Sequence, residues 1–131
     1  MTIKLNKCII TDCNNIQQSR ANGKPNGKKC NTCNKLLSKY GITTPERDNL
    51  IQKQNNLCLI CKKIIFFTNK LTGGCSSHDA VVDHCHATGK VRGILCGQCN
   101  LMLGNSLDNE LTLLKAVEYL KQNKEKQNEQ A

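Results

Sequence analysis

The feature that most constrains this 131-residue chain is the arrangement of its ten cysteines. Eight of them form four closely spaced pairs, Cys8-x4-Cys13, Cys30-x2-Cys33, Cys58-x2-Cys61 and Cys96-x2-Cys99. Two such pairs brought together supply four thiolates, which is the ligand set of a tetrahedral zinc site. The sequence therefore predicts two structural zinc sites, one in each half of the chain. Four protein ligands leave no open position for catalysis at either zinc.

The chemistry of these cysteines depends on the compartment, because disulfides are rare in the cytosol and metal sites are common there. Residues 1–7 lack the apolar segment of a signal peptide, and no apolar run approaches the roughly 20 residues that span a membrane. We therefore expect a cytoplasmic protein, neither secreted nor membrane-bound, with reduced cysteines. Aromatic residues make up only 3% of the chain, so zinc would have to compensate for a weak core.

Local patterns predict two short helices between the cysteine pairs. Residues 34–40 form one helix, which ends at Gly41. Residues 44–46, Thr-Pro-Glu, are a start signal in which the threonine caps, the proline takes the first helical position and the glutamate favours the positive end of the dipole. We expect this second helix to run to about Asn55 and to connect the two cysteine modules.

The second half of the chain favours a hairpin followed by helices. Residues 63–67 are β-prone, 80–82 predict a short strand and 91–95 predict its partner, with a turn at Thr88-Gly89-Lys90. The last segment is helical up to about Gln122, beyond which we expect fraying. Its apolar stripe is typical of a core-facing helix, and the other interpretation is a homodimer through this helix. The stripe consists of Leu107, Leu111, Leu114, Val117 and Leu120.

A second unusual feature is the run Asp83-His84-Cys85-His86, in a chain with only three histidines. It follows the predicted strand 80–82, and Asn100 comes directly after the last cysteine pair. This placement favours a catalytic site. Two other interpretations stay open: a third zinc site, in which Cys75 and His78 pair with Cys85 or a nearby histidine, and a turn with a capping aspartate and solvated histidines.

Residues 57–104 resemble the recombination endonuclease VII family of phages, a branch of the His-Me finger (ββα-metal, HNH-like) nucleases. The resemblance rests on Cys58-x2-Cys61, on the run Val82-Asp83-His84-Cys85-His86-Ala87-Thr88-Gly89-Lys90-Val91-Arg92-Gly93-Ile94-Leu95-Cys96-x2-Cys99-Asn100, and on Leu103-Gly104. The stretch Tyr40-Gly41-Ile42-Thr43 also resembles what precedes this motif in many such proteins. The resemblance implies a nuclease and, for a viral protein, the cytoplasm of the host.

The resemblance also implies a role for each residue of the site. Asp83 and Asn100 would supply oxygen ligands to one catalytic Mg²⁺, with Mn²⁺ as the alternative. His84 would act as general base on the attacking water, since histidine has an unperturbed pKa of about 6.5. His86 would orient the phosphate or the base. The second zinc would fix the distance between the hairpin and the helix that carries Asn100.

DNA is the partner that this resemblance implies. The net charge of +9 suits an anionic partner, although solubility alone would also explain it. Lys90 and Arg92 are placed to meet the DNA backbone, or are plain surface charges.

The chain also departs from the family: Leu103 stands where some members carry an acidic residue, and only about 27 residues follow Gly104. Junction resolution therefore does not follow from the resemblance.

We thus predict an α+β protein with two zinc modules, the second of which carries a ββα-metal site. Its expected parts are a four-cysteine zinc module at 1–43, a linking helix at 44–56, the nuclease domain at 57–106, and a C-terminal helix with a polar tail at 107–131. The expected function is Mg²⁺-dependent cleavage of DNA. The alternative is a double-zinc module that binds nucleic acid without cutting it.

Overall fold

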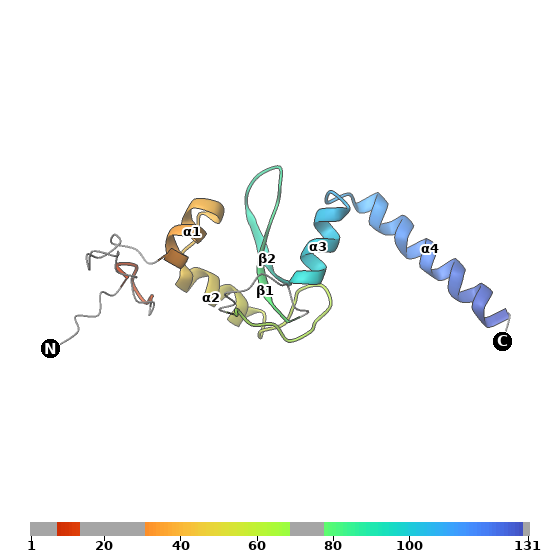
Figure 1. Cartoon of the computed structure of the whole chain (residues 1–131), viewed down its shortest axis with the longest axis horizontal. Helices are drawn as coiled ribbons and strands as arrows, with labels where there is room; N and C mark the ends of the chain where they lie inside the picture. Colours follow the sequence, from red (N-terminus) through yellow and green to blue (C-terminus); the bar gives the residue numbers. More distant parts are fainter. Residues whose placement is uncertain (1–7, 14–30, 69–77, 130–131) are drawn as a thin grey trace, which may run out of the picture.

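The computed structural model describes residues 8–13, 31–68 and 78–129. Within these ranges the chain is an α+β protein with one two-stranded antiparallel sheet. The order strand, strand, helix that the sequence predicted is present as β1, β2 and α3. No described helix is long and apolar enough to cross a membrane. The elements are α1 (Asn31–Tyr40), α2 (Thr44–Lys53), β1 (Ala80–His84), β2 (Val91–Cys96), α3 (Gly97–Asn105) and α4 (Glu110–Glu129) (Figure 1).

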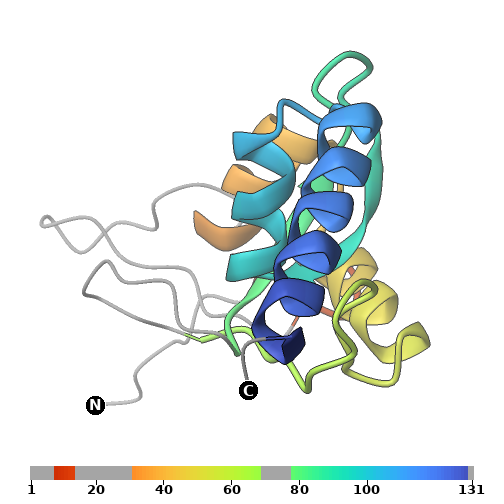
Figure 2. The ribbon, with the colours of Figure 1, turned by 90° about the vertical axis from the view of Figure 1, so that its right-hand side faces the viewer.

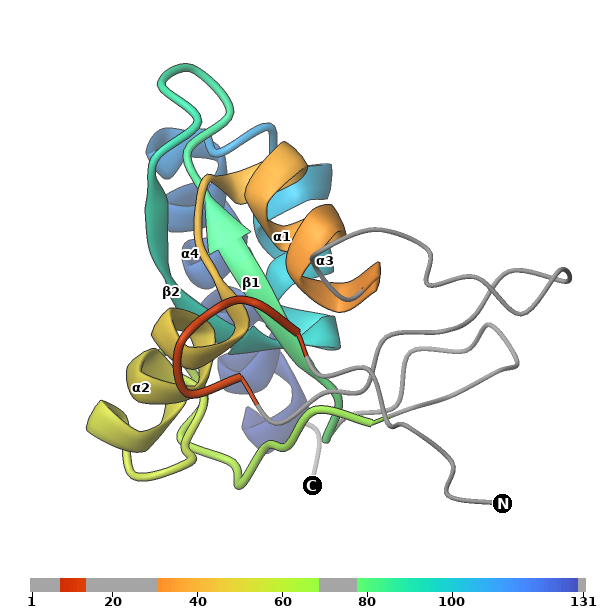
Figure 3. The same cartoon turned by 90° about the vertical axis from the view of Figure 1, so that its left-hand side faces the viewer.

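The β1–β2 hairpin stands at the centre of the molecule, with α1 and α2 on one side and α3 and α4 on the other (Figure 1). Both strands pack against α3, β2 also packs against α2, and α1 packs against α2. In the view from the N-terminal side, α1 lies in front of α3 (Figure 3). From the opposite side α4 is nearest the viewer, with the hairpin behind it (Figure 2). The first cysteine module and α3 therefore approach the hairpin from different sides.

The register of the hairpin decides which face each side chain of β1 takes. Regular pairs run from Ala80↔Cys96 to Asp83↔Gly93, and the next pair is His84↔Val91, so Arg92 is an extra, bulged residue of β2. Successive side chains of a strand point to opposite faces. Asp83 and His84 therefore leave β1 on different sides. The strand includes both residues, whereas the sequence predicted that it would end at Val82.

The N-terminus of α2 differs from the prediction by one residue, because Thr43 and not Thr44 is the cap. Oγ1 of Thr43 accepts a bond from the Glu46 N–H at 3.4 Å, and Oε2 of Glu46 accepts one from the Thr43 N–H at 2.6 Å. This reciprocal capping box lowers the pKa of the Glu46 carboxyl. Thr44 is buried instead, with its hydroxyl 2.9 Å from Sγ of Cys33. The start of α2 is thus anchored to the first cysteine module.

Three further elements differ in extent from the expectation. α1 begins at Asn31, three residues before the predicted helix 34–40. Residues 63–67 belong to no strand and contribute only the isolated bridges Leu57↔Ile64 and Phe66↔Asp79. α4 continues to Glu129, well past the point where fraying was expected. The last difference has a local cause, because the lysines, glutamines and glutamates after residue 121 have high helix propensity.

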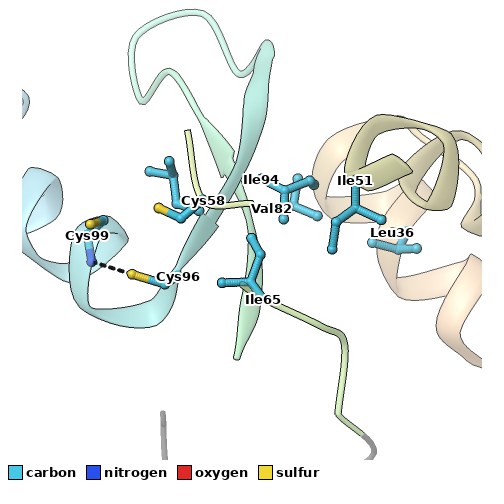
Figure 4. Packing of buried hydrophobic residues seen from close by; sticks show 9 residues of the cluster. Leu36, Ile51, Cys58, Ile65, Val82, Ile94, Cys96 and Cys99 are labelled. Atoms are coloured by element: carbon cyan, nitrogen blue, oxygen red, sulfur yellow. Dashed lines mark hydrogen bonds between the residues drawn. The ribbon is translucent and has the colours of Figure 1, made fainter. Parts of the chain in front are cut away.

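The core lies where α1, α2, the segment after α2 and the hairpin meet, and the cysteine sulfurs are part of it. Ile65 and Ile94 are fully buried at its centre. Cys58, Cys96 and Cys99 extend this cluster toward α3 (Figure 4). The core is therefore small, as the low aromatic content predicted. Its buried members are Leu36, Ile51, Cys58, Ile65, Val82, Ile94, Leu95, Cys96 and Cys99.

Gln54, at the C-terminal cap of α2, joins this helix to the outer edge of β2. Its side chain accepts a bond from the Ile94 N–H at 2.9 Å and donates to the Ile94 carbonyl at 2.8 Å and the Leu57 carbonyl at 3.0 Å. Gln54→Ala is expected to lower the free energy of unfolding by about 1–3 kcal/mol, because it leaves polar groups of an edge strand without partners. Urea unfolding of the zinc-loaded protein measures this loss. Gln52→Ala, at an exposed position of α2, is the control and should change stability by no more than about 0.5 kcal/mol.

Candidate metal centres and active site

The four cysteines of the second module converge on one point. Cys58 and Cys61 lie after α2, whereas Cys96 ends β2 and Cys99 lies in the first turn of α3. Their sulfurs all lie within 4.8 Å of one another, and those of Cys61 and Cys96 are 3.7 Å apart. Tetrahedral zinc with Zn–S bonds of about 2.3 Å places sulfurs about 3.8 Å apart. The cluster therefore fits a structural zinc ion, as predicted.

Burial and hydrogen bonding shift the pKa values of these thiols in opposite directions. Burial disfavours the Cys58 thiolate, but backbone N–H groups, above all that of Cys96, lower the pKa of this thiol to about 6. Burial, followed by hydrogen bonding among the neighbouring sulfurs, raises the pKa of Cys99 well above its usual range. A bound cation favours thiolates because it compensates their charge. The sulfur set is therefore one that a divalent cation would complete.

Three of the four predicted ligands of the first module also converge. The sulfurs of Cys8, Cys13 and Cys33 lie within 4.8 Å of one another, and all three residues are buried. Sγ of Cys13 lies 3.5 Å from Sγ of Cys33. Cys30, the fourth expected ligand, lies outside the described residues. Because Cys33 belongs to α1, this cluster holds one end of that helix.

The other end of α1 reaches a cavity of about 240 Å³ that it shares with β1 and α3. Three of the predicted site residues, His84, His86 and Asn100, meet at this cavity. Asn100 follows Cys99 in α3, so the second cysteine cluster sets its position relative to the hairpin. The lining residues are Lys39, Tyr40, Val81, Val82, His84, His86, Asn100, Leu101 and Gly104.

Tyr40 and Lys39, both from α1, are cavity residues to which sequence reasoning gave no role. The Tyr40 ring meets the His84 ring edge-on, with the centroids 5.2 Å apart, and Nζ of Lys39 lies 5.0 Å from the Tyr40 centroid. The rings of His84 and His86 are 5.0 Å apart. The half-buried His84 is therefore packed between an aromatic ring and a second imidazole. The sequence signal for Tyr40 was its place in the stretch that resembles the family.

Asp83 does not line the cavity. It is buried, and its two carboxylate oxygens accept hydrogen bonds from Arg92, at 2.7 Å from Nε and 2.9 Å from Nη2. Arg92 also donates to Oδ1 of Asp108 at 3.1 Å, and these two acidic partners raise the pKa of its guanidinium. The other carboxylate oxygen of Asp108 lies 2.7 Å from Nδ1 of His86. Asp108, in the turn between α3 and α4, is thus a further residue that the sequence analysis missed.

The remaining candidates are spread over the hairpin and its approach. Lys90 is exposed in the turn, beside Gly89, whose φ of +70° favours glycine. His78 is bonded through Nδ1 to the Ile64 carbonyl and stacks on Phe66. Among the described residues, neither His78 nor the half-buried Cys85 joins a group of possible metal ligands. Cys75, the other member of the alternative third zinc site, lies outside those residues.

Comparison with known proteins places the chain in a family. A family model described as recombination endonuclease VII matches residues 33–122. The chain belongs to this family. It is 35% identical over 88 residues to the Gene 59 protein of Mycobacterium phage D29 and 36% identical over 87 residues to that of Mycobacterium phage L5. Each match covers 66% of this chain and 48% of the relative, so the chain spans about half the length of these curated relatives.

A solved structure is also similar to this chain. It is the ββα-Me type II restriction endonuclease Hpy99I, which is 28% identical in sequence and aligns with a TM-score of 0.42. The alignment covers 81% of this chain and 56% of the other.

Proposed function

We propose that the chain is a metal-dependent endonuclease that hydrolyses phosphodiester bonds of DNA. The observation that carries this proposal is the meeting of His84, His86 and Asn100 at one cavity, next to a four-cysteine cluster. A purely structural zinc module does not need two imidazoles and an amide at a common cavity. Membership of the recombination endonuclease VII family supports the same reaction.

The oxygen ligands proposed for one hard divalent cation, Mg²⁺ or alternatively Mn²⁺, are Asn100 and Asp83. Asn100 offers an amide oxygen at the cavity, whereas the buried Asp83 carboxylate lies off the cavity and is bound by Arg92. A carboxylate has about four lone-pair sites, so Asp83 can bind a metal beside Arg92. Its side chain must turn toward the cavity before it can share one cation with Asn100. Mg²⁺ keeps several waters and needs few protein ligands. When bound by Asp83 and Asn100, the cation would stabilise charge on the scissile phosphate and the leaving oxygen.

Separate side chains at the cavity would accept the proton, orient the reacting groups and contact the phosphate backbone. His84 takes the proton of the attacking water as general base. Tyr40, packed edge-on against it, restrains the orientation of the His84 ring. His86 orients the phosphate, and Lys39 at the cavity provides a positive charge for the backbone. Lys90 and the exposed edge of Arg92 meet the DNA further along the hairpin.

The rival function is a double-zinc module that binds nucleic acid without cutting it. It predicts salt-sensitive binding dominated by phosphate contacts, and no cleavage product. Both functions are tested with a panel of labelled DNAs, namely linear, nicked, single-stranded and four-way branched, with and without added Mg²⁺. Cutting that depends on Mg²⁺ is the expected result, and the preferred DNA identifies the substrate. Binding without any product at high protein concentration would favour the rival. Chelator alone is a poor control, because it also removes zinc.

We further propose that α4 pairs with α4 of a second copy. The expected core role of its stripe is not realised, because Leu111, Leu114 and Leu120 are each at least 60% exposed. Among the described elements, none packs extensively against α4. A helix of 20 residues is about 30 Å long, enough for a paired interface. An antiparallel pair would set Glu110 near Lys124 of the second copy, which gives opposite charges at both ends.

The solution mass at several protein concentrations tests this pairing. We expect a dimer whose share rises with concentration, and a monomer for Leu114→Lys, because the substitution places a charge in the apolar stripe. Lys115→Leu, which adds no charge to the stripe, should stay dimeric. A single-chain mass for the wild type at every concentration would contradict the pairing.

A further inference from the structure

Asp108 is held in a fixed position at the junction of α3 and α4. Its backbone N–H donates to the Leu103 carbonyl at 3.0 Å, and its φ of +54° is left-handed. Each carboxylate oxygen has its own partner: Oδ2 lies 2.7 Å from Nδ1 of His86, and Oδ1 accepts from Nη2 of Arg92 at 3.1 Å. The carboxylate therefore connects the turn after α3 to two residues of the hairpin.

The hydrogen bond between Asp108 and His86 decides which ring nitrogen of His86 carries the hydrogen. An ionised carboxylate only accepts hydrogen bonds. Contacts with His86, followed by Arg92, lower the pKa of the Asp108 carboxyl, so it is ionised at neutral pH. Nδ1 of His86 must therefore carry the hydrogen that is shared with Asp108, because otherwise two acceptors would face each other. Nε2 is then the ring nitrogen left for water or a phosphate oxygen at the cavity.

We propose that Asp108 is a positioning residue of the active site, which fixes the tautomer and direction of His86 while it holds Arg92 between two acids. The role of His86 in cutting rests on the function proposed above. Arg92 forms ion pairs with both Asp83 and Asp108. The ion pair with Asp108 therefore competes with, and weakens, the ion pair between Arg92 and Asp83. Neither the cysteine frame nor the Asp83-His84 run contains this residue, and its partners lie 22 and 16 positions away in the sequence.

Asp108→Asn is the informative variant. Asparagine tolerates the left-handed backbone, so the turn should survive. Its amide has only one oxygen, which can accept from His86 or from Arg92 but not serve both as the carboxylate does. Asp48→Asn is the matched control, because Asp48 is also paired with an arginine but lies on α2 away from the cavity. Zinc content and thermal unfolding should be unchanged in both variants.

Two measurements test the proposal. A long-range ¹H–¹⁵N correlation spectrum at mildly alkaline pH, where histidine is neutral, should show Nδ1–H for His86 in the wild type and a change in its ring signals in Asp108→Asn. His86→Gln identifies the signals. The cutting rate at saturating DNA should fall by about 10- to 100-fold in Asp108→Asn, the range known for partners that orient metal-binding histidines, with DNA affinity changed less than about threefold. Asp48→Asn should match the wild type in both.

An Nε2–H tautomer of His86 in the wild type would overturn the proposal, and so would unchanged ring signals in Asp108→Asn. A shifted ring signal with a wild-type cutting rate would also overturn it. If the wild type does not cut DNA at all, the proposed function fails, and the ring signals alone then decide whether Asp108 holds His86.

Discussion

Cys96→Ser is expected to unfold the second module and to remove one of the two zinc ions that we expect per chain. Cys96 ends β2 and caps α3, where its sulfur accepts a bond from the Cys99 N–H at 3.4 Å. The metal would also tie this junction to Cys58 and Cys61, in the segment after α2. A structural zinc contributes on the order of 10 kcal/mol to folding in such modules. That contribution is comparable to the whole stability of an ordinary domain.

Metal analysis together with circular dichroism during urea unfolding measures this effect. Cys85→Ser is the matched control, because Cys85 lies outside both cysteine clusters that the structure describes. It should retain both zinc ions and the wild-type unfolding midpoint. A Cys96→Ser protein with full zinc content and unchanged stability would show that the sulfur cluster is not the frame of this module.

The second large effect is expected at His84. His84→Ala should lower the rate of DNA cutting by about 10²- to 10⁴-fold, which is what a general acid or base typically contributes. The half-buried ring packs against Tyr40 and His86, and it belongs to neither cysteine cluster. DNA affinity and zinc content should therefore stay close to those of the wild type, as gel shifts and metal analysis can measure. A loss of DNA affinity as large as the loss of rate would assign His84 to binding rather than to chemistry.

The parts of this protein that could be predicted from sequence are those set by short-range chemistry. The cysteine pairs predicted two sulfur clusters, because ligand spacing within a knuckle is a local property. The short strand-like runs 80–82 and 91–95, with a glycine turn between them, predicted the hairpin. The meeting of His84 with Asn100 could be anticipated because Asn100 directly follows a cysteine of the same cluster.

The parts that could not be predicted depend on contacts between distant segments. The pairing of Asp83 with Arg92 follows from a bulge in β2, which no local pattern indicates. Asp108 contacts His86 and Arg92 only because the turn after α3 brings it back to the hairpin. Tyr40 reaches His84 because α1 packs beside the hairpin, and both the first cysteine cluster and the Thr44 contact hold it there. The apolar stripe of α4 was expected in the core because a sequence alone does not show which elements a helix meets.

We propose that DNA is cut at the cavity formed by His84, His86 and Asn100. The most direct test is the ratio of single-turnover cutting rates of His84→Ala and His78→Ala, on the same labelled DNA with added Mg²⁺ and with equal zinc content. His78 is exposed and bonded to the Ile64 carbonyl, and it does not line the cavity. We expect His78→Ala to cut like the wild type and His84→Ala to be slower by about 10²-fold or more. Equal rates for the two variants would contradict the proposal.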